Sequence, residues 1–255
     1  MRTPSAIHAR TVRPVADAHF EHPRLVAIYD ALDPDRRDLE PYLDLIAEAG
    51  AGSVLDLGCG TGVFALLLVD RGLDVIGVDP AAASLDLARA KPGADRVRWI
   101  HGDATSLPSL QVDAVTMTGN AAQAIVGQAQ WQGTLRGLRQ ALRPGGRLVF
   151  ETRDPAFRGW EEWTRAASEK VTDIPGVGPV RTWVELTRVD LPLVSFRSHF
   201  AFGADGLLLT SDSTLHFRER SELEADLRAC GFLVDDVRGA PDRPGREFVV
   251  LAHRR

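Results

Sequence analysis

Short apolar runs alternate with stretches of helical period from about Ser53 to Arg153, and this alternation constrains the fold more than any other feature. Apolar runs separated by helices are typical of a parallel sheet that is covered by helices on both faces. Right-handed crossovers then place the carboxyl ends of the strands along one edge, where open α/β sheets bind ligands. The expected strands are 54–57, 74–78, 97–100, 112–117 and 147–151.

The pattern changes after Arg153. From about Val180 to Phe217 polar and apolar residues alternate, which predicts about three antiparallel strands, with turns at 190–192 and 203–206. A capping-box helix from Ser221 and two apolar runs are expected to return the chain to the main sheet.

These patterns divide the chain into three expected parts. The insertion follows the fifth strand, so we expect it to lie over the crevice edge as a lid that sets substrate choice. The expected parts are a flexible arm at 1–20, a cofactor-binding domain at 21–152 and 220–255, and an antiparallel insertion at 153–219.

Composition argues against several classes of protein. The net charge of the 255 residues is −5, and a chain this acidic is a poor candidate for nucleic-acid binding. No apolar run approaches the ~18 residues of a membrane span, and the first residues lack the apolar core of a signal peptide. Cys59 and Cys230 form no CxxC pattern, so we expect no disulfide scaffold, no metal site and a cytoplasmic location.

The first expected strand runs into a glycine loop, Asp56-Leu57-Gly58-Cys59-Gly60-Thr61-Gly62. A dinucleotide fingerprint needs its third glycine one position later, where this chain has Val63, so a nicotinamide site is disfavoured. Glycines allow a ligand to approach the backbone closely. The free N–H groups of the helix that follows suit a carboxylate, such as that of an amino-acid moiety.

Two carboxylates follow the next strands. Asp79 ends the second strand, where it can accept hydrogen bonds from two ribose hydroxyls. Asp103 follows the third strand, where it can accept from an adenine amino group while the Ala104 N–H meets a ring nitrogen. The plainer interpretations are a surface carboxylate for Asp79 and a turn cap for Asp103.

These residues together resemble the class I S-adenosylmethionine-dependent methyltransferases over roughly 25–151, with a weaker return at 221–254. The resemblance rests on 54–62, Val78-Asp79, Gly102-Asp103-Ala104 and Leu142-Arg143-Pro144-Gly145-Gly146. It implies an α/β fold with a doubly wound, seven-stranded Rossmann-like sheet whose final strand is antiparallel, and S-adenosylmethionine as cofactor. The cofactor-binding residues that it implies are Tyr29, Asp56, Gly58, Gly60, Asp79, Pro80, Asp103, Ala104, Gly119 and Asn120.

Specific roles follow from the same resemblance. Gly58 and Gly60 are expected to line the methionine end, and Gly119-Asn120 to lie near the sulfonium. Tyr29 resembles the N-terminal aromatic residue that closes over the cofactor in many small-molecule members, although a core aromatic is an equally good interpretation.

The predicted reaction is in-line transfer of a methyl group to an O, N or C nucleophile of a small-molecule acceptor. The main task of the protein is then alignment. His199 and His216 of the insertion are candidates for a general base, while a packed or surface histidine is the plainer interpretation of each.

Two alternative functions stay open. One is a non-catalytic module that binds S-adenosylmethionine or S-adenosylhomocysteine. The other is a methyltransferase that acts on a protein or nucleic acid, and the acidic charge argues against nucleic acid. The sequence also lacks an Asn-Pro-Pro-Tyr-type tetrapeptide after the fourth strand, which argues against base methylation. A homodimer is a possible assembly of such a chain, and the sequence does not determine the oligomeric state.

Overall fold

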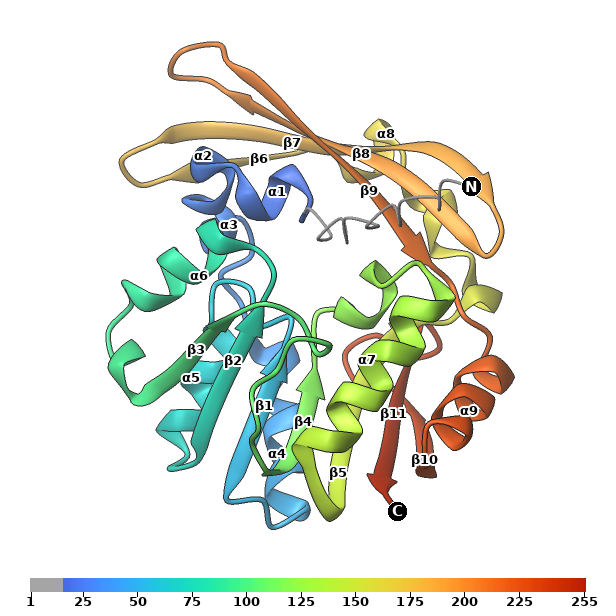
Figure 1. Ribbon diagram of the computed structural model, residues 1–255. Coiled ribbons are helices and arrows are strands. Elements are labelled where there is room, and N and C mark those ends of the chain that lie inside the picture. Colours follow the sequence, from blue (N-terminus) through green and yellow to red (C-terminus); the bar gives the residue numbers. More distant parts are fainter. Residues whose placement is uncertain (1–15) are drawn as a thin grey trace, which may run out of the picture.

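A seven-stranded sheet forms the centre of the computed structural model, which describes residues 16–255 (Figure 1). The strand order is β3-β2-β1-β4-β5-β11-β10, and β11 is antiparallel to both of its neighbours. The predicted doubly wound sheet with an antiparallel final strand is therefore confirmed. Its strands are β1 (Ser53–Leu57), β2 (Asp74–Asp79), β3 (Val97–His101), β4 (Val112–Met117), β5 (Leu142–Arg153), β10 (Phe232–Gly239) and β11 (Glu247–Arg254).

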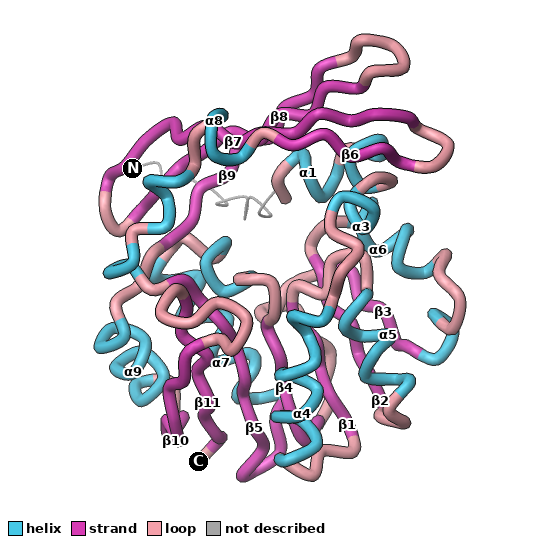
Figure 2. The backbone as a smooth tube through the Cα atoms, turned by 180° about the vertical axis from the view of Figure 1, so that it is seen from behind, coloured by secondary structure: helices cyan, strands magenta, loops and turns pink. Residues whose placement is uncertain are grey.

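Helices cover both faces of this main sheet (Figure 2). Alternation along β1 sends Val54 into the core beneath the helices at 40–48 and 63–70, and Leu55 into the core beneath the helices at 128–141 and 220–229. The longer helices are α4 (Glu40–Glu48), α5 (Val63–Asp70), α6 (Ala82–Arg89), α7 (Gln128–Ala141) and α9 (Arg220–Ala229). Short helical turns are η1 (Arg37–Leu39), η2 (Ala94–Arg96), η3 (Ala121–Ala124), η4 (Pro155–Phe157), η5 (Gly159–Glu162) and α8 (Arg165–Ser168).

One predicted helix start is wrong in detail. Helix α9 begins at Arg220 with Glu219 as its N-cap residue, and no side chain makes a capping hydrogen bond there. The capping box predicted from Ser221 is therefore not formed, and α9 is held by its buried face, including Leu223 and Leu227.

A second, antiparallel sheet follows β5, as predicted, but it has four strands rather than about three. Its order is β6-β7-β8-β9, and the turns expected at 190–192 and 203–206 separate β7, β8 and β9. It lies beyond the edge at which β1, β2 and β4 end (Figure 1). Its strands are β6 (Lys170–Ile174), β7 (Gly178–Asp190), β8 (Leu193–Phe202) and β9 (Leu208–His216).

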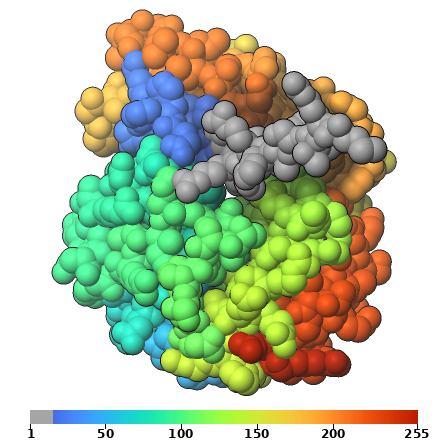
Figure 3. Space-filling view, viewed as in Figure 1, coloured from blue at the N-terminus to red at the C-terminus, as the bar shows by residue number. Residues whose placement is uncertain are grey.

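Three short helices near the N-terminus connect the two sheets: α1 (Ala18–Glu21), α2 (Pro23–Val26) and α3 (Tyr29–Leu32). Residues 1–15 of the predicted flexible arm lie outside the described residues. Of its described part, residues 16 and 17 precede α1 and residues 18–20 belong to α1. In Figure 3 these helices fill the space between the second sheet and α6.

The contacts of this N-terminal segment reach both sheets. Toward the second sheet, the Ser213 hydroxyl donates to Asp17 at 2.5 Å, and Leu25 packs with Phe200. Toward the main sheet, Glu21 accepts the Ala82 N–H at 2.9 Å. The second sheet is therefore attached to the crevice loops through the N-terminal helices as well as through its own connections to β5 and α9.

Candidate cofactor-binding site

The loops after β1 and β4 meet at the point where the strand order reverses. Gly58 has a φ of +77°, and a Cβ atom there would lie 2.7 Å from the Cβ of Ala121. Only glycine satisfies both the left-handed backbone and this close approach. Since ligands of open α/β sheets bind where the strand order reverses, these loops form the candidate site.

Asp79 holds the glycine loop from the neighbouring strand. One carboxylate oxygen accepts the Gly60 N–H at 2.8 Å, and the other accepts the Ala81 N–H at 2.7 Å. Burial raises the pKa of Asp79, although these two hydrogen bonds act in the opposite direction. A carboxylate has about four acceptor positions, so both oxygens can still accept a hydroxyl.

The glycine loop is open beside Asp79. Gly60 has a φ of +51°, and no heavy atom lies within 4 Å of the position that its Cβ would occupy. A side chain would fill this space, which is available to a ligand that passes along the backbone. The geometry of Asp79 and Gly60 therefore fits a ligand with vicinal hydroxyl groups.

Asp56 is inside the sheet rather than on the surface of the crevice. Its side chain is 1% exposed, and one carboxyl oxygen accepts the Thr116 hydroxyl at 2.9 Å. Burial raises its pKa to about 7. The predicted contact with the cofactor is thus not apparent in the geometry, and the residue connects β1 with β4.

This environment predicts an unusual pH dependence of stability. The folded chain keeps the Asp56 proton up to about pH 7, whereas the unfolded carboxyl ionises near 3.8. Unfolding therefore releases a proton between these values, so Asp56 reduces stability as pH rises. Between pH 4 and 8 we expect the unfolding free energy of the wild type to fall by roughly 4 kcal/mol relative to that of Asp56→Asn. Urea denaturation at several pH values measures this difference.

Asp113→Asn is a control of opposite sign. Burial raises the pKa of Asp113, but hydrogen bonds from Ser53 and Arg143 outweigh it and lower the pKa. The wild type should therefore gain stability over Asp113→Asn as pH rises from acid toward neutral. Parallel pH profiles for wild type and Asp56→Asn would contradict the assigned environment of Asp56.

Asp103 and Ala104 lie at the end of β3. One oxygen of Asp103 accepts both the N–H and the hydroxyl of Thr105, at 2.8 and 2.6 Å, so the residue does close a turn. Ala104 is 2% exposed and packs against Gly137 of α7. On the adjacent strand, the Pro80 carbonyl lies 2.9 Å from the His101 ring. The residues expected at an adenine thus lie on neighbouring strand ends.

Tyr29 is part of an aromatic cluster that sequence reasoning did not predict. Its ring centroid lies 5.1 Å from that of His19 and 5.8 Å from that of Phe20, and His19 also contacts Phe200 of β8. Burial lowers the pKa of His19 to about 4, so its ring is neutral at neutral pH. No motif marks His19, because its surroundings come from three distant segments.

His199 is not brought to the crevice. Its ring stacks on Trp183 with a centroid distance of 4.5 Å, and its Nε2 lies 2.7 Å from Glu185. The next residue, Phe200, packs toward the N-terminal helices, so alternation along β8 directs His199 to the opposite face. The prediction that His199 is a general base facing the crevice is therefore wrong.

His216 connects the end of β9 to the loop before α7. Its Nδ1 lies 2.9 Å from the Val126 carbonyl oxygen, and its side chain is 8% exposed. Burial lowers its pKa. These contacts describe a packed histidine, and none of them joins it to the loops after β1 and β2.

Asn120 sits in a buried polar network that sequence reasoning also missed. Its backbone has a φ of +60°, and its N–H donates to Glu151 at 3.2 Å while its Nδ2 donates to Glu247 at 3.1 Å. Arg243 donates to both carboxylates, and the Tyr42 hydroxyl donates to Glu151. The sequence did carry a signal for this network, because an acidic residue lies at one end of each of two apolar strand segments, Glu151 in 148–151 and Glu247 in 247–251.

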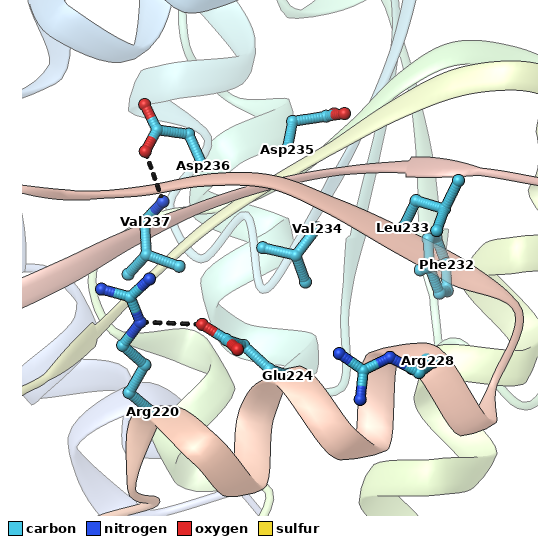
Figure 4. A pocket seen from close by; sticks show the side chains of 9 residues that line it. All are labelled: Arg220, Glu224, Arg228, Phe232, Leu233, Val234, Asp235, Asp236 and Val237. Carbon is cyan, nitrogen blue, oxygen red and sulfur yellow. Dashed lines mark hydrogen bonds and ion pairs between the residues drawn. The ribbon is translucent and has the colours of Figure 1, made fainter.

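Two hollows elsewhere on the surface are separate from these residues. One of about 270 Å³ lies between α9 and β10, where Arg220 pairs with Glu224 at 2.7 Å (Figure 4). Another of about 440 Å³ lies between the second sheet and the start of α7, and its lining includes Asp17 and Gln130. Neither is lined by Asp79, Asp103 or Asn120.

Residues 16–255 hold neither a cluster of metal ligands nor a membrane-spanning helix. That part of the chain has no group of three or more His, Cys, Asp or Glu side chains arranged to hold a metal ion. It also has no helix of the length and apolar character needed to cross a membrane.

Comparison with known proteins identifies the central domain. Residues 54–146 match the family model described as a methyltransferase domain. The chain is 37% identical over 105 residues to the cypemycin N-terminal methyltransferase of Streptomyces sp, covering 41% of this chain and 43% of that protein. This match agrees with the predicted resemblance to the class I S-adenosylmethionine-dependent methyltransferases, and residues 54–146 are similar to a methyltransferase domain. The chain spans about half the length of the curated relatives that it matches.

Solved structures share the fold over most of the chain. An S-adenosylmethionine-dependent methyltransferase from Clostridium acetobutylicum superposes with a TM-score of 0.74 at 16% identity, covering 91% of this chain and 98% of that one. The amino pentose methyltransferase CalS10 from Micromonospora echinaspora, solved with S-adenosylmethionine bound, gives a TM-score of 0.68 at 23% identity, covering 89% and 97%. At these identities the likeness establishes the fold.

Proposed function

We propose that this chain is an enzyme that binds S-adenosylmethionine at the carboxyl ends of β1, β2 and β3 and methylates a small molecule. The observation that carries the proposal is Asp79, whose two oxygens are each held by one backbone N–H beside the open glycine loop. This arrangement leaves acceptor positions for the two hydroxyls of a ribose. The methyltransferase domain at 54–146 supports the same cofactor.

The remaining cofactor contacts follow from the order of the strands. Gly58 and Gly60 line the methionine end, while Pro80, Asp103 and Ala104 lie toward the adenine. Gly119 and Asn120 follow β4 on the other side of the switch point. Tyr29 closes the site from the N-terminal helices, since its neighbour Asp30 accepts the Thr61 hydroxyl of the glycine loop at 2.6 Å.

The bound cofactor supplies a methyl group that is already activated on a sulfonium. The protein must then align the acceptor with that methyl group and keep water away, and alignment alone can supply roughly 7–11 kcal/mol in favourable cases. We assign alignment to the second sheet, at 153–219, which acts as a lid over the domain formed by 21–152 and 220–255. No general base is assigned, because His199 points away from the crevice.

A small-molecule acceptor is supported by the position of the second sheet and by the relatives. The second sheet lies beyond the carboxyl ends of the main-sheet strands, with the N-terminal helices between the two sheets, and this arrangement favours an acceptor small enough to fit beneath the second sheet (Figure 1). Solved structures with this fold include an amino pentose methyltransferase, and curated relatives include demethylmenaquinone methyltransferases.

Transfer of a labelled methyl group tests this proposal. The chain is incubated with methyl-labelled S-adenosylmethionine and a panel of small amines, alcohols, phenols and quinols, and with a protein extract as a separate acceptor. We expect label to appear in a small molecule and Asp79→Ala to reduce its rate. Saturable cofactor binding without transfer to any acceptor would favour a sensor, and transfer only to protein would overturn the assigned acceptor class.

A further inference from the structure

Two buried acceptor atoms beside the proposed methyl-transfer site have no donor among residues 16–255. They are Oδ1 of Asn120 and Oε2 of Glu247. The two side chains belong to residues that are 5% and 4% exposed. Buried acceptors of this kind are rare in proteins, because each costs the free energy of its lost hydration.

The orientation of the Asn120 amide is determined by its partner. Glu247 Oε1 receives Nδ2 of Asn120 at 3.1 Å and an Arg243 nitrogen at 3.1 Å. An oxygen that accepts from Arg243 carries no proton to donate, so the amide nitrogen must face it and Oδ1 must face away. Reversing the amide would place two acceptors against each other.

The backbone also presents this side chain to the crevice loops. Asn120 adopts a left-handed φ of +60°, and its N–H is held by Glu151 at 3.2 Å. The next residue, Ala121, is the one that abuts Gly58 of the glycine loop. Asn120 therefore lies on the loop that faces the methionine end of the proposed cofactor site, and Glu247, at the start of β11, is hydrogen-bonded to it.

The chemistry of the free atoms selects the ligand. Two acceptors need two donor hydrogens, and an amino group supplies at least two from one nitrogen. A hydroxyl group supplies one, and a carboxylate or phosphate supplies none and would be repelled by Glu247. We propose that Asn120 and Glu247 together bind the amino group of a ligand in the methyl-transfer site.

This inference rests on the proposed function, because it takes the ligand to be either the methyl acceptor or the cofactor. An amine acceptor would make nitrogen the methylated atom. The α-amino group of S-adenosylmethionine has the same chemistry, and the experiment below separates the two sources. In both cases Arg243 and Glu151 are positioning residues that hold the pair in place.

The test uses two variants of the full chain. Asn120→Gly removes the amide but keeps a residue that adopts φ of +60° without strain. Glu247→Gln has nearly the same shape and retains one acceptor oxygen for Asn120, but loses the second. Binding of S-adenosylmethionine and of 5′-methylthioadenosine, which lacks the amino-acid moiety, is measured by calorimetry, and methyl transfer is measured with an amine panel.

Two outcomes support the proposal. If the cofactor supplies the amino group, both variants bind S-adenosylmethionine roughly tenfold or more weakly and bind 5′-methylthioadenosine unchanged. If the acceptor supplies it, cofactor binding is unchanged and the KM for an amine rises roughly tenfold or more, with a smaller change in kcat.

Other outcomes overturn it. Variants that alter neither cofactor binding nor amine KM would show that water occupies the two acceptors. The same conclusion follows if the wild type methylates no amine and both variants bind the cofactor normally. Failure of the wild type to bind S-adenosylmethionine at all would instead overturn the proposed function, so the two failures are distinct.

Discussion

Asp79→Ala is expected to weaken binding of S-adenosylmethionine by roughly ten- to hundredfold, as measured by titration calorimetry. Two causes contribute to this loss. The carboxylate is the proposed acceptor for the ribose hydroxyls, and it also accepts the N–H groups of Gly60 and Ala81 at 2.8 and 2.7 Å. Its removal takes away ligand hydrogen bonds and also loosens the loop that approaches the methionine end.

Asp103→Ala provides the matched control for this prediction. One oxygen of Asp103 is already used by Thr105, so we expect a smaller loss of affinity than at Asp79. Asp79→Asn keeps one acceptor oxygen and should fall between the alanine variant and the wild type. Wild-type affinity in Asp79→Ala would show that the ribose is bound elsewhere.

Gly137→Ala is expected to destabilise the fold by roughly 2 kcal/mol or more, although alanine is the better helix former. Gly137 lies within α7, and a Cβ atom there would overlap the carbonyl oxygen of Ala104. Because that oxygen belongs to backbone, α7 and the loop after β3 must separate. The variant should therefore also bind S-adenosylmethionine more weakly.

Gly133→Ala is the control within the same helix. A Cβ atom there would meet only the Thr105 side chain, at 3.4 Å, which is ordinary contact. This change should leave stability unaltered or raise it by up to about 1 kcal/mol. Urea denaturation of both variants measures the contrast, and equal stabilities for the two would contradict the packing of α7 on Ala104.

The main sheet could be predicted because its signals are local. The glycine loop, Asp79 and the apolar strands each occupy a few consecutive residues, so periodicity and spacing reveal them. The second sheet was predicted with one strand too few, because β6 reads Lys-Val-Thr-Asp-Ile and only Ile174 at its end is buried. A short exposed strand at a sheet edge carries little hydrophobic pattern.

The rest of the candidate site could not be predicted because its contacts join distant segments. Glu247 meets Asn120 across 127 positions of sequence, and His19 donates its backbone N–H to Ser211 across 192. Asp56 belongs to a strong local motif, yet its surroundings are set by Thr116 on the neighbouring strand. Spacing within one segment gives no information about such pairs, and it cannot reveal on which face of β8 His199 lies.

A crystal structure of the chain with S-adenosylhomocysteine tests the central claim most directly. We expect both ribose hydroxyls within hydrogen-bonding distance of the Asp79 carboxylate, the adenine beside Asp103 and Ala104, and the sulfur facing Gly119 and Asn120. A ligand bound away from the loops after β1 and β2, or a ribose held by residues other than Asp79, would contradict the account.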